Sequence, residues 1–170
     1  EIDVDEPTYM DITQRKTAEL FAAACALPAL FQPATLHLTE KLLDFGKNVG
    51  VSFQLVDDML DFTAARSDLG KPVMADLREG RVTLPIILLL KRVDGRTRDR
   101  LASVASSGRF DVISEQEVLD MVRTSGVLDE VRRRAYKSSE DAVRLAGAFP
   151  EGPERDALVR ASEMLLDRGV

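Results

Sequence analysis

Cysteine and histidine are nearly absent from this chain, which has one of each among its 170 residues. One cysteine cannot form an internal disulfide, and Cys25, which lies in a run of small apolar residues, indicates a protein of a reducing compartment. The only histidine, His37, has no spaced partner with which it could form a zinc site. We therefore expect neither a disulfide framework nor a histidine-based metal site.

Long apolar runs and long basic runs are also missing. No apolar stretch approaches the roughly 20 residues of a membrane-spanning helix, and residues 1–5 do not resemble a signal peptide. The net charge is −6 and the longest basic run is the triplet at residues 132–134, so a surface for nucleic acid is not expected. These absences predict a soluble, cytoplasmic protein with no transmembrane segment and no nucleic-acid partner.

Helical periodicity, in contrast, is present along almost the whole chain. Apolar residues make up 45% and charged residues 31% of the sequence, which suffices for a packed core, and we predict a single all-helical domain over residues 1–170. Thr8, Thr83 and Ser114 are the expected N-caps, and Pro28 is expected to close the first helix. The predicted helices span residues 8–25, 34–63, 84–90, 97–105, 114–124 and 126–149, with one more at the C-terminal end.

The second of these helices carries a cluster of acids near its end. At about 100° per residue, Asp57 and Asp61 lie one turn apart, Asp58 lies beside them and Gln54 lies one turn earlier. Their oxygens can converge on one point. Because apolar residues cover most of the helix, the carboxylates would repel one another unless lysines or divalent metal ions lie among them. A solvated acidic face is the alternative, which the apolar flanks disfavour.

Two lysines are candidates for the compensating charge. Lys16 follows Ile12 and precedes Leu20 at helical spacing, which places it in the apolar stripe of the first helix. A lysine in that stripe indicates either an anionic ligand or a stem that lies along the surface with its ammonium in water. Lys71 belongs to the polar segment of residues 64–80, whose length is compatible with a lid or with a plain connector.

Two glycines, Gly46 and Gly50, interrupt the long helix one to three turns before the acids. Glycine lowers helix stability, so these positions indicate either close packing of a neighbouring helix or room for the tail of a ligand.

Together these motifs resemble the second aspartate-rich half of the trans-prenyltransferases, the polyprenyl diphosphate synthases. The resemblance covers nearly the whole chain, but the family's first aspartate-rich motif and its arginine pair have no counterpart here. It implies an antiparallel helical bundle of the isoprenoid synthase type, of which this chain is the C-terminal half. The matching motifs are Lys16-Thr17-Ala18, Phe53-Gln54, Asp57-Asp58, Asp61, Gly70-Lys71, Gly80-x-x-Thr83-Leu84-Pro85, and Ser125-Gly126 before a long helix.

The resemblance also implies a chemistry, the condensation of an allylic diphosphate with isopentenyl diphosphate by a prenyltransferase of isoprenoid biosynthesis. Mg²⁺ prefers oxygen ligands and usually binds one or two carboxylates together with substrate phosphates. Metal ions and lysines would stabilise the charge that develops on the departing diphosphate. The implied metal ligands are Asp57, Asp58 and Asp61, the implied catalytic residues are these three with Lys16 and Lys71, and the implied substrate contacts are Lys16, Thr17, Gln54 and Lys71.

Two other classes of function stay open. One is a fragment of a class I terpene synthase, which shares the ionisation chemistry. The other is a non-catalytic helical subunit of a heteromeric synthase. Because the first aspartate-rich motif is missing, we expect the isolated chain to be inactive and to associate with the missing N-terminal half or to form a homodimer, since half a bundle exposes a large apolar surface.

Overall fold

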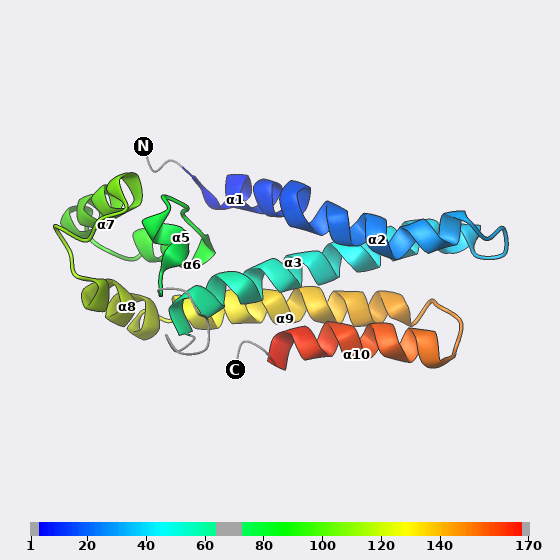
Figure 1. Cartoon of the computed structure of the whole chain (residues 1–170). Coiled ribbons are helices and arrows are strands. Elements are labelled where there is room, and N and C mark those ends of the chain that lie inside the picture. Colours follow the sequence, from blue (N-terminus) through cyan, green and yellow to red (C-terminus); the bar gives the residue numbers. More distant parts are fainter. Residues whose placement is uncertain (1–3, 64–72, 168–170) are drawn as a thin grey trace. The chain divides into compact units, whose positions relative to one another are not determined.

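The computed structural model describes residues 4–63 and 73–167, and all regular elements in these ranges are helices (Figure 1). The all-α fold class is therefore confirmed. None of the described helices has the length and apolar character needed to cross a bilayer. In chain order the elements are α1 (Glu6–Thr13), the π-helix η1 (Gln14–Ala18), α2 (Glu19–Leu30), the 3₁₀-helix η2 (Leu36–Leu38), α3 (Thr39–Thr63), α5 (Ala75–Arg78), α6 (Leu84–Leu90), α7 (Gly95–Ser107), α8 (Glu115–Thr124), α9 (Val127–Ala146) and α10 (Pro153–Asp167).

The contacts divide the chain into two compact units. The first unit comprises Glu1–Tyr9 and Asp57–Val131, and the second comprises Met10–Val56 and Arg132–Val170. The helices α1, α3 and α9 each contribute residues to both units. One domain over residues 1–170 stays a prediction, and each unit is described below by itself.

The core of the first unit is built around α6. This helix is apolar on all sides, and its residues 84–89 are all buried. The helices α7 and α8 each bury one face, through Leu101 and Val104 and through Val118 and Val122, which is the expected pattern for helices that cover a central element. At the end of α7, Gly108 has a φ of 68°, and a Cβ at this position would lie 2.3 Å from the carbonyl oxygen of Arg78. Only glycine fits this turn.

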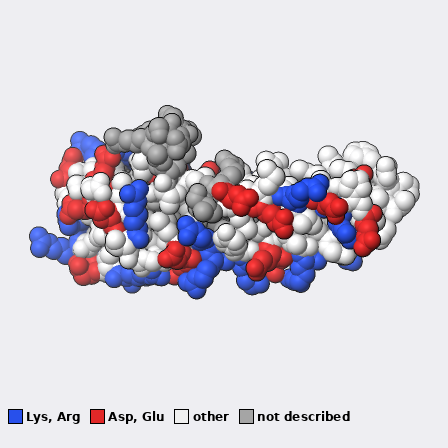
Figure 2. All heavy atoms as spheres, turned by 90° about the horizontal axis from the view of Figure 1, so that it is seen from below, with Lys and Arg blue, Asp and Glu red and all other residues white. Residues whose placement is uncertain are grey.

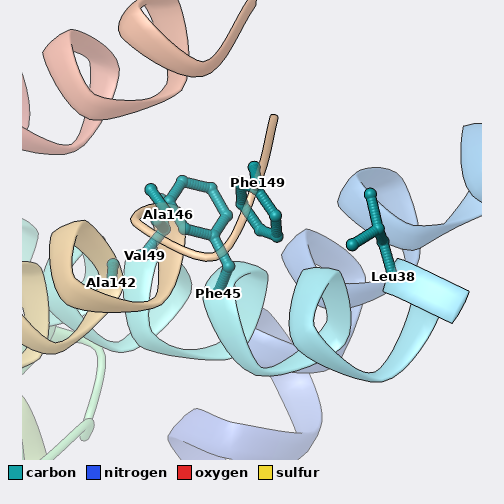
Figure 3. Packing of buried hydrophobic residues seen from close by; sticks show 6 residues of the cluster. All are labelled: Leu38, Phe45, Val49, Ala142, Ala146 and Phe149. Atoms are coloured by element: carbon teal, nitrogen blue, oxygen red, sulfur yellow. The ribbon is translucent and has the colours of Figure 1, made fainter. Parts of the chain in front are cut away.

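The core of the second unit lies among α3, α9 and the segment after α9 (Figure 3). The rings of Phe45 and Phe149 meet edge to face, with their centroids 5.8 Å apart, an arrangement that aromatic pairs favour. The hydroxyl of Ser52 on α3 donates to the buried carbonyl oxygen of Ala135 on α9 at 3.0 Å, which fixes these two helices against each other. The buried residues of this cluster are Leu38, Phe45, Val49, Ala142, Ala146 and Phe149.

The two glycines of α3 lie where the preceding helical segment packs against it within the second unit. A Cβ at Gly46 would be 2.6 Å from Cα of Ala22, and one at Gly50 would be 2.7 Å from Cα of Ala18. Both distances are far shorter than ordinary carbon contacts. Close helix packing, one of the two explanations that the sequence allows, therefore accounts for both glycines.

Several helix boundaries differ from the predicted ones. The first helix begins at Glu6, because the side chain of Asp5 accepts a hydrogen bond from the backbone N–H of Thr8 at 2.9 Å. Asp5 is therefore the capping residue in place of Thr8. Pro28 lies inside α2, which continues to Leu30. A proline loses its own N–H, but its carbonyl still accepts the N–H of Phe31 at 3.3 Å, so the last turn can form.

The long helix α3 begins at Thr39 instead of residue 34, because a short 3₁₀ turn, η2, precedes it. The helix includes Thr63, the predicted last residue, and the residues that follow lie outside the described part of the chain. Thr83 occupies the N-cap position of α6 with extended dihedral angles, as predicted, but its side chain makes no capping hydrogen bond.

The capping box predicted at Ser114 is confirmed. The hydroxyl of Ser114 accepts from the backbone N–H of Glu117 at 3.2 Å, and the Glu117 carboxylate accepts from the backbone N–H of Ser114 at 2.9 Å. The second of these bonds, together with the Ser114 hydroxyl and Arg100, lowers the pKa of Glu117.

We expect Ser114→Ala to lower the free energy of unfolding by about 1 kcal/mol at neutral pH, because an N-cap is lost. The hydrogen bonds of a carboxylate with a lowered pKa stabilise the fold above its unfolded-state pKa and are lost as the pH falls through the folded-state pKa. The difference between wild type and variant should therefore shrink below about pH 4. Urea unfolding followed by circular dichroism measures it. Ser106→Ala, in an exposed part of α7, is the control and should not destabilise the protein.

Candidate functional site

The predicted acidic residues lie near the end of α3, and their environments differ sharply. Asp57 is exposed, Asp61 is half-buried and Asp58 is almost fully buried, with 1% of its surface accessible. All three belong to the first unit. Successive helical residues point about 100° apart, which permits Asp58 to face inward while Asp57 and Asp61 face outward.

Asp61 is held by the start of α5. Its two carboxylate oxygens accept hydrogen bonds from the backbone N–H groups of Ala75 and Asp76, at 2.9 and 3.2 Å. Its own carbonyl accepts the N–H of Met74 at 2.9 Å, and Met74 has a left-handed φ of 58° that turns the chain into α5. Burial raises the pKa of Asp61, as do the charges of Asp76 and Asp57, against the lowering effect of the two N–H donors. Relative to an exposed aspartate, this balance favours the protonated carboxyl of Asp61.

A small acidic cavity of about 120 Å³ opens beside these residues in the first unit. Four carboxylates and one guanidinium lie around it. The guanidinium is that of Arg81, whose Nε donates to Asp76 at 2.8 Å and which also pairs with Glu79. The lining residues are Asp57, Leu60, Asp61, Ala75, Asp76, Glu79 and Arg81.

The acidic cavity fits a metal ion only in part. Its donors are carboxylate oxygens, which Mg²⁺ prefers. However, among residues 4–63 and 73–167 no group of three or more acidic, histidine or cysteine side chains is placed to hold a metal together. The convergence of all three aspartates on one point does not occur here, because Asp58 lies buried and does not line the cavity. The cavity suits a magnesium ion that takes one or two carboxylates and completes its shell with water and phosphate oxygens.

The other predicted contacts, Lys16, Thr17 and Gln54, belong to the second unit. The hydroxyl of Thr17 donates to Oε1 of Gln54 at 2.9 Å, so this pair is brought together. Lys16 and Thr17 lie in the π-helix η1, an uncommon element that is frequent at functional sites. The wider π turn changes the direction of the side chains that follow it, which the predicted continuous helix did not include.

Lys16 lies on the exposed surface of the second unit, which agrees with the second of the two explanations that the sequence allows, a lysine with its ammonium in water. The stripe itself exists, but its apolar members are exposed too, Ile12 by 49% and Leu20 by 71%. The opposite face of α2 is the buried one, through Ala22, Ala26 and Ala29. Lys71 lies outside the described residues.

Three residues near the site were not among the site residues predicted from the sequence. Tyr9 donates its hydroxyl proton to Asp58, and Asp76 and Arg81 line the acidic cavity. Asp76 and Arg81 are contained in the polar segment and the motif that follows it, so their neighbourhood was visible in the sequence. Tyr9 is 49 residues from its partner, and no periodicity within one helix can reveal such a contact.

Comparison with known proteins gives a consistent family. A family described as polyprenyl synthetase matches residues 1–122. The all-trans-nonaprenyl-diphosphate synthase (geranyl-diphosphate specific) of Rhodobacter capsulatus is 34% identical over 167 residues, which are 98% of this chain and 50% of that protein. Heptaprenyl diphosphate synthase component 2 of Geobacillus stearothermophilus is 35% identical over 156 residues, which are 91% of this chain and 48% of that protein.

A solved structure agrees with these matches. The polyprenyl synthase of Caulobacter crescentus CB15, complexed with calcium and isoprenyl diphosphate, superposes with a TM-score of 0.88 at 31% identity, covering 100% of this chain and 52% of that one. The chain thus spans about half the length of the relatives that it matches, and the fold expected from the sequence resemblance is confirmed.

Proposed function

The chain belongs to the polyprenyl synthetase family, and from this membership we propose that it forms the C-terminal half of a polyprenyl diphosphate synthase. The complete enzyme would condense an allylic diphosphate with isopentenyl diphosphate. The observation that carries the proposal is the acidic cavity at the end of α3, where Asp57 and Asp61 present oxygens beside an otherwise apolar helix. The relative from Caulobacter crescentus was solved with a divalent cation and an isoprenyl diphosphate, the kinds of ligand that such a cavity suits.

Asp57 and Asp61 are the residues that we assign to Mg²⁺. Mg²⁺, when bound, would neutralise the charge that develops on the departing diphosphate. The exposed Asp57 can reach a ligand in the cavity, and the Asp61 carboxylate is already oriented by the N–H groups of Ala75 and Asp76. Prior orientation lowers the cost of organising the site during the reaction. Asp58, which the sequence assigned to the same metal, keeps that assignment only as a prediction, because its carboxylate is buried.

For the diphosphate we propose contacts from Lys16, Thr17, Lys71 and Gln54. The exposed Lys16 has its ammonium available to an anion, and a lysine binds phosphate oxygens as a point charge. The bond from Thr17 orients the Gln54 side chain, so that its NH₂ group can donate to a phosphate oxygen. Apolar walls around the reacting carbons would keep water from a carbocation. The cytoplasm, with its reducing conditions, is the compartment that we propose, because the only cysteine lacks a partner.

An exposed apolar surface on the second unit supports the missing half as a partner. The helix α2 buries its alanines, yet its larger apolar side chains face outward, and charged residues are sparse at the right-hand end of Figure 2, where the connection from α2 to α3 lies. Monomeric proteins rarely expose large apolar patches, so several exposed large apolar side chains on one helical segment favour a partner. We propose that the N-terminal half of the bundle covers this surface. The surface consists of Ile12, Leu20, Leu27, Leu30, Phe31 and Leu36.

Without that half, we expect the purified chain to self-associate through the exposed apolar surface. Leu20→Asp combined with Phe31→Asp should convert it to a monomer, because a charge at these positions must be desolvated on association. Sedimentation velocity measures the change. Met164→Asp, at another exposed apolar residue (66%) of the second unit, is the control. A double variant that sediments like the wild type would exclude this surface.

A two-chain arrangement is the form of the proposal that one relative favours. The Geobacillus stearothermophilus relative is named heptaprenyl diphosphate synthase component 2, which describes one part of a multi-component enzyme. In such an arrangement the present chain would work beside a second helical chain. A homodimer of the completed bundle is compatible with both a two-chain and a one-chain enzyme.

A further inference from the structure

Tyr9 and Asp58 form a buried hydrogen bond within the first unit. The hydroxyl of Tyr9 donates to Oδ2 of Asp58 at 2.5 Å, and the two residues are 7% and 1% exposed. A buried carboxylate is costly unless donors satisfy its oxygens. Tyr9 supplies such a donor from a position 49 residues away in the sequence, so the bond ties α1 to the acidic turn of α3.

The backbone position of Tyr9 is fixed by hydrogen bonds at the start of α1. Its backbone N–H donates to the carbonyl oxygen of Asp5 at 3.0 Å, and the Asp5 side chain caps the same turn through Thr8. One residue after Asp5, Glu6 accepts a hydrogen bond from Nζ of Lys91 at 2.9 Å, which joins α1 to the residue that follows α6. A tyrosine on a helix that is anchored in this way can act as a rigid support.

The aspartate occupies the centre of the acidic turn. Asp58 follows Asp57 directly and precedes Asp61 by three residues, and residues of one helix turn rotate together. A support that holds Asp58 on the buried side of α3 therefore also determines where Asp57 and Asp61 point. These two are the acidic residues of the turn that line the acidic cavity.

We propose that Tyr9 is a positioning residue, which holds Asp58 on the buried side of α3 and thereby keeps Asp57 and Asp61 facing the acidic cavity. The phenol is uncharged, so this contact supports a carboxylate without adding a cation that would compete with a metal for the cluster. Partners of this outer kind typically alter metal affinity by about 10–100-fold when they are removed. The inference rests on the proposed function only in taking Asp57 and Asp61 as the metal-facing residues.

Amide hydrogen exchange of the metal-free chain tests the inference without any need for activity. The N–H groups of Ala75 and Asp76 bond to the Asp61 carboxylate, so their exchange reports how firmly the acidic turn is held. Tyr9→Phe keeps the ring and removes the donor, and it should accelerate exchange at these two amides about tenfold, whereas the amides of α8 keep their wild-type rates. Equal acceleration in α8, or no change at Ala75 and Asp76, would overturn the inference.

The chain offers a matched control, because it contains only two tyrosines. Tyr136 lies on α9 and is 39% exposed, so Tyr136→Phe should leave the two amides unchanged. If Tyr9→Phe does not fold, two substitutions of Asp58 provide the test instead. Asp58→Asn keeps an oxygen that accepts the phenol proton, so the amides of Ala75 and Asp76 should exchange at rates within about threefold of the wild type. Asp58→Ala should accelerate exchange at the same two amides by the full tenfold. Identical rates in the two variants contradict the proposal.

Binding of Mn²⁺ in the presence of inorganic diphosphate separates this inference from the proposed function. If wild type binds and Tyr9→Phe binds about tenfold more weakly, with Tyr136→Phe unaffected, both stand. If wild type does not bind but the exchange result is as expected, the proposed function fails and the positioning role remains. If wild type and Tyr9→Phe bind equally, the positioning role is wrong.

Discussion

Asp57→Asn should reduce the affinity of the chain for Mn²⁺ and inorganic diphosphate by at least about 100-fold. The substitution keeps the size of the side chain and removes the charge that a divalent cation requires. Loss of a direct carboxylate ligand should cost at least as much as the roughly 10–100-fold loss caused by outer partners. Asp57 is exposed at the edge of the acidic cavity, so its substitution disturbs little else. Isothermal titration with Mn²⁺ and diphosphate together measures the effect.

The matched control is Asp99→Asn, which makes the same change of charge at an exposed position of α7 outside the acidic cavity. It should bind like the wild type, since exposed charges separated by more than about 10 Å are largely screened by salt. Asp61→Asn is less informative, because Asp61 also accepts two backbone hydrogen bonds and its loss affects folding. If Asp57→Asn and the wild type bind Mn²⁺ and diphosphate equally well, Asp57 is not a ligand of the metal.

The second large effect is expected on stability, from Gly46→Ala. The added methyl group would lie 2.6 Å from Cα of Ala22 and from the carbonyl oxygen of Phe21, and backbone atoms cannot move aside as a flexible side chain can. Overpacking of this kind costs up to about 3 kcal/mol, while alanine in a helix gains about 1 kcal/mol over glycine. We therefore expect a net loss of about 2 kcal/mol, or a fall in Tm of about 4–8 °C for a protein of this size.

Gly95→Ala provides the comparison for this prediction. Gly95 is the first residue of α7, and a Cβ there would meet nothing within 4 Å. The same substitution should leave stability unchanged or raise it slightly, because it removes backbone freedom from the unfolded chain. Thermal unfolding followed by circular dichroism distinguishes the two. A Gly46→Ala variant as stable as the wild type would show that α2 and α3 separate easily.

The sequence predicts those features that depend on local periodicity. The apolar run that forms α6 and the capping box at Ser114 were both correctly predicted, because each depends on residues within a few positions of one another. The all-α fold class was correctly predicted for the same reason. The N-cap at Asp5 was missed by three residues, since Thr8 is an equally good capping residue and only the three-dimensional structure shows which side chain bonds the first turn.

The site was predictable as a set of residues but not as a geometry. The spacing of Asp57, Asp58 and Asp61 located the acidic turn, yet the same spacing permits a convergent triad and a turn with one member inside. In the structure Asp58 is the buried member, and its carboxylate accepts a hydrogen bond from Tyr9, a residue distant in sequence. The π-helix around Lys16 was equally invisible, because the extra residue in its turn leaves the apolar pattern almost unchanged.

The exposure of Lys16, Leu20 and Phe31 shows a second limit of prediction from sequence periodicity. Periodicity identifies an apolar stripe, but it does not say whether the surface that covers the stripe belongs to the same chain. Here the alanine face of α2 packs against α3 and the face of larger side chains stays open. A surface of that kind is what a half of a larger bundle should present.

The central claim, that this chain is one half of a polyprenyl diphosphate synthase, is tested most directly by a condensation assay with an allylic diphosphate, isopentenyl diphosphate and Mg²⁺. The chain is assayed alone and in a complex with the half of the Rhodobacter capsulatus relative that it does not match. We predict no product from the chain alone and a lengthened prenyl diphosphate from the complex, which Asp57→Asn abolishes. Product formed by the isolated chain, or none from a stable complex, would contradict the claim.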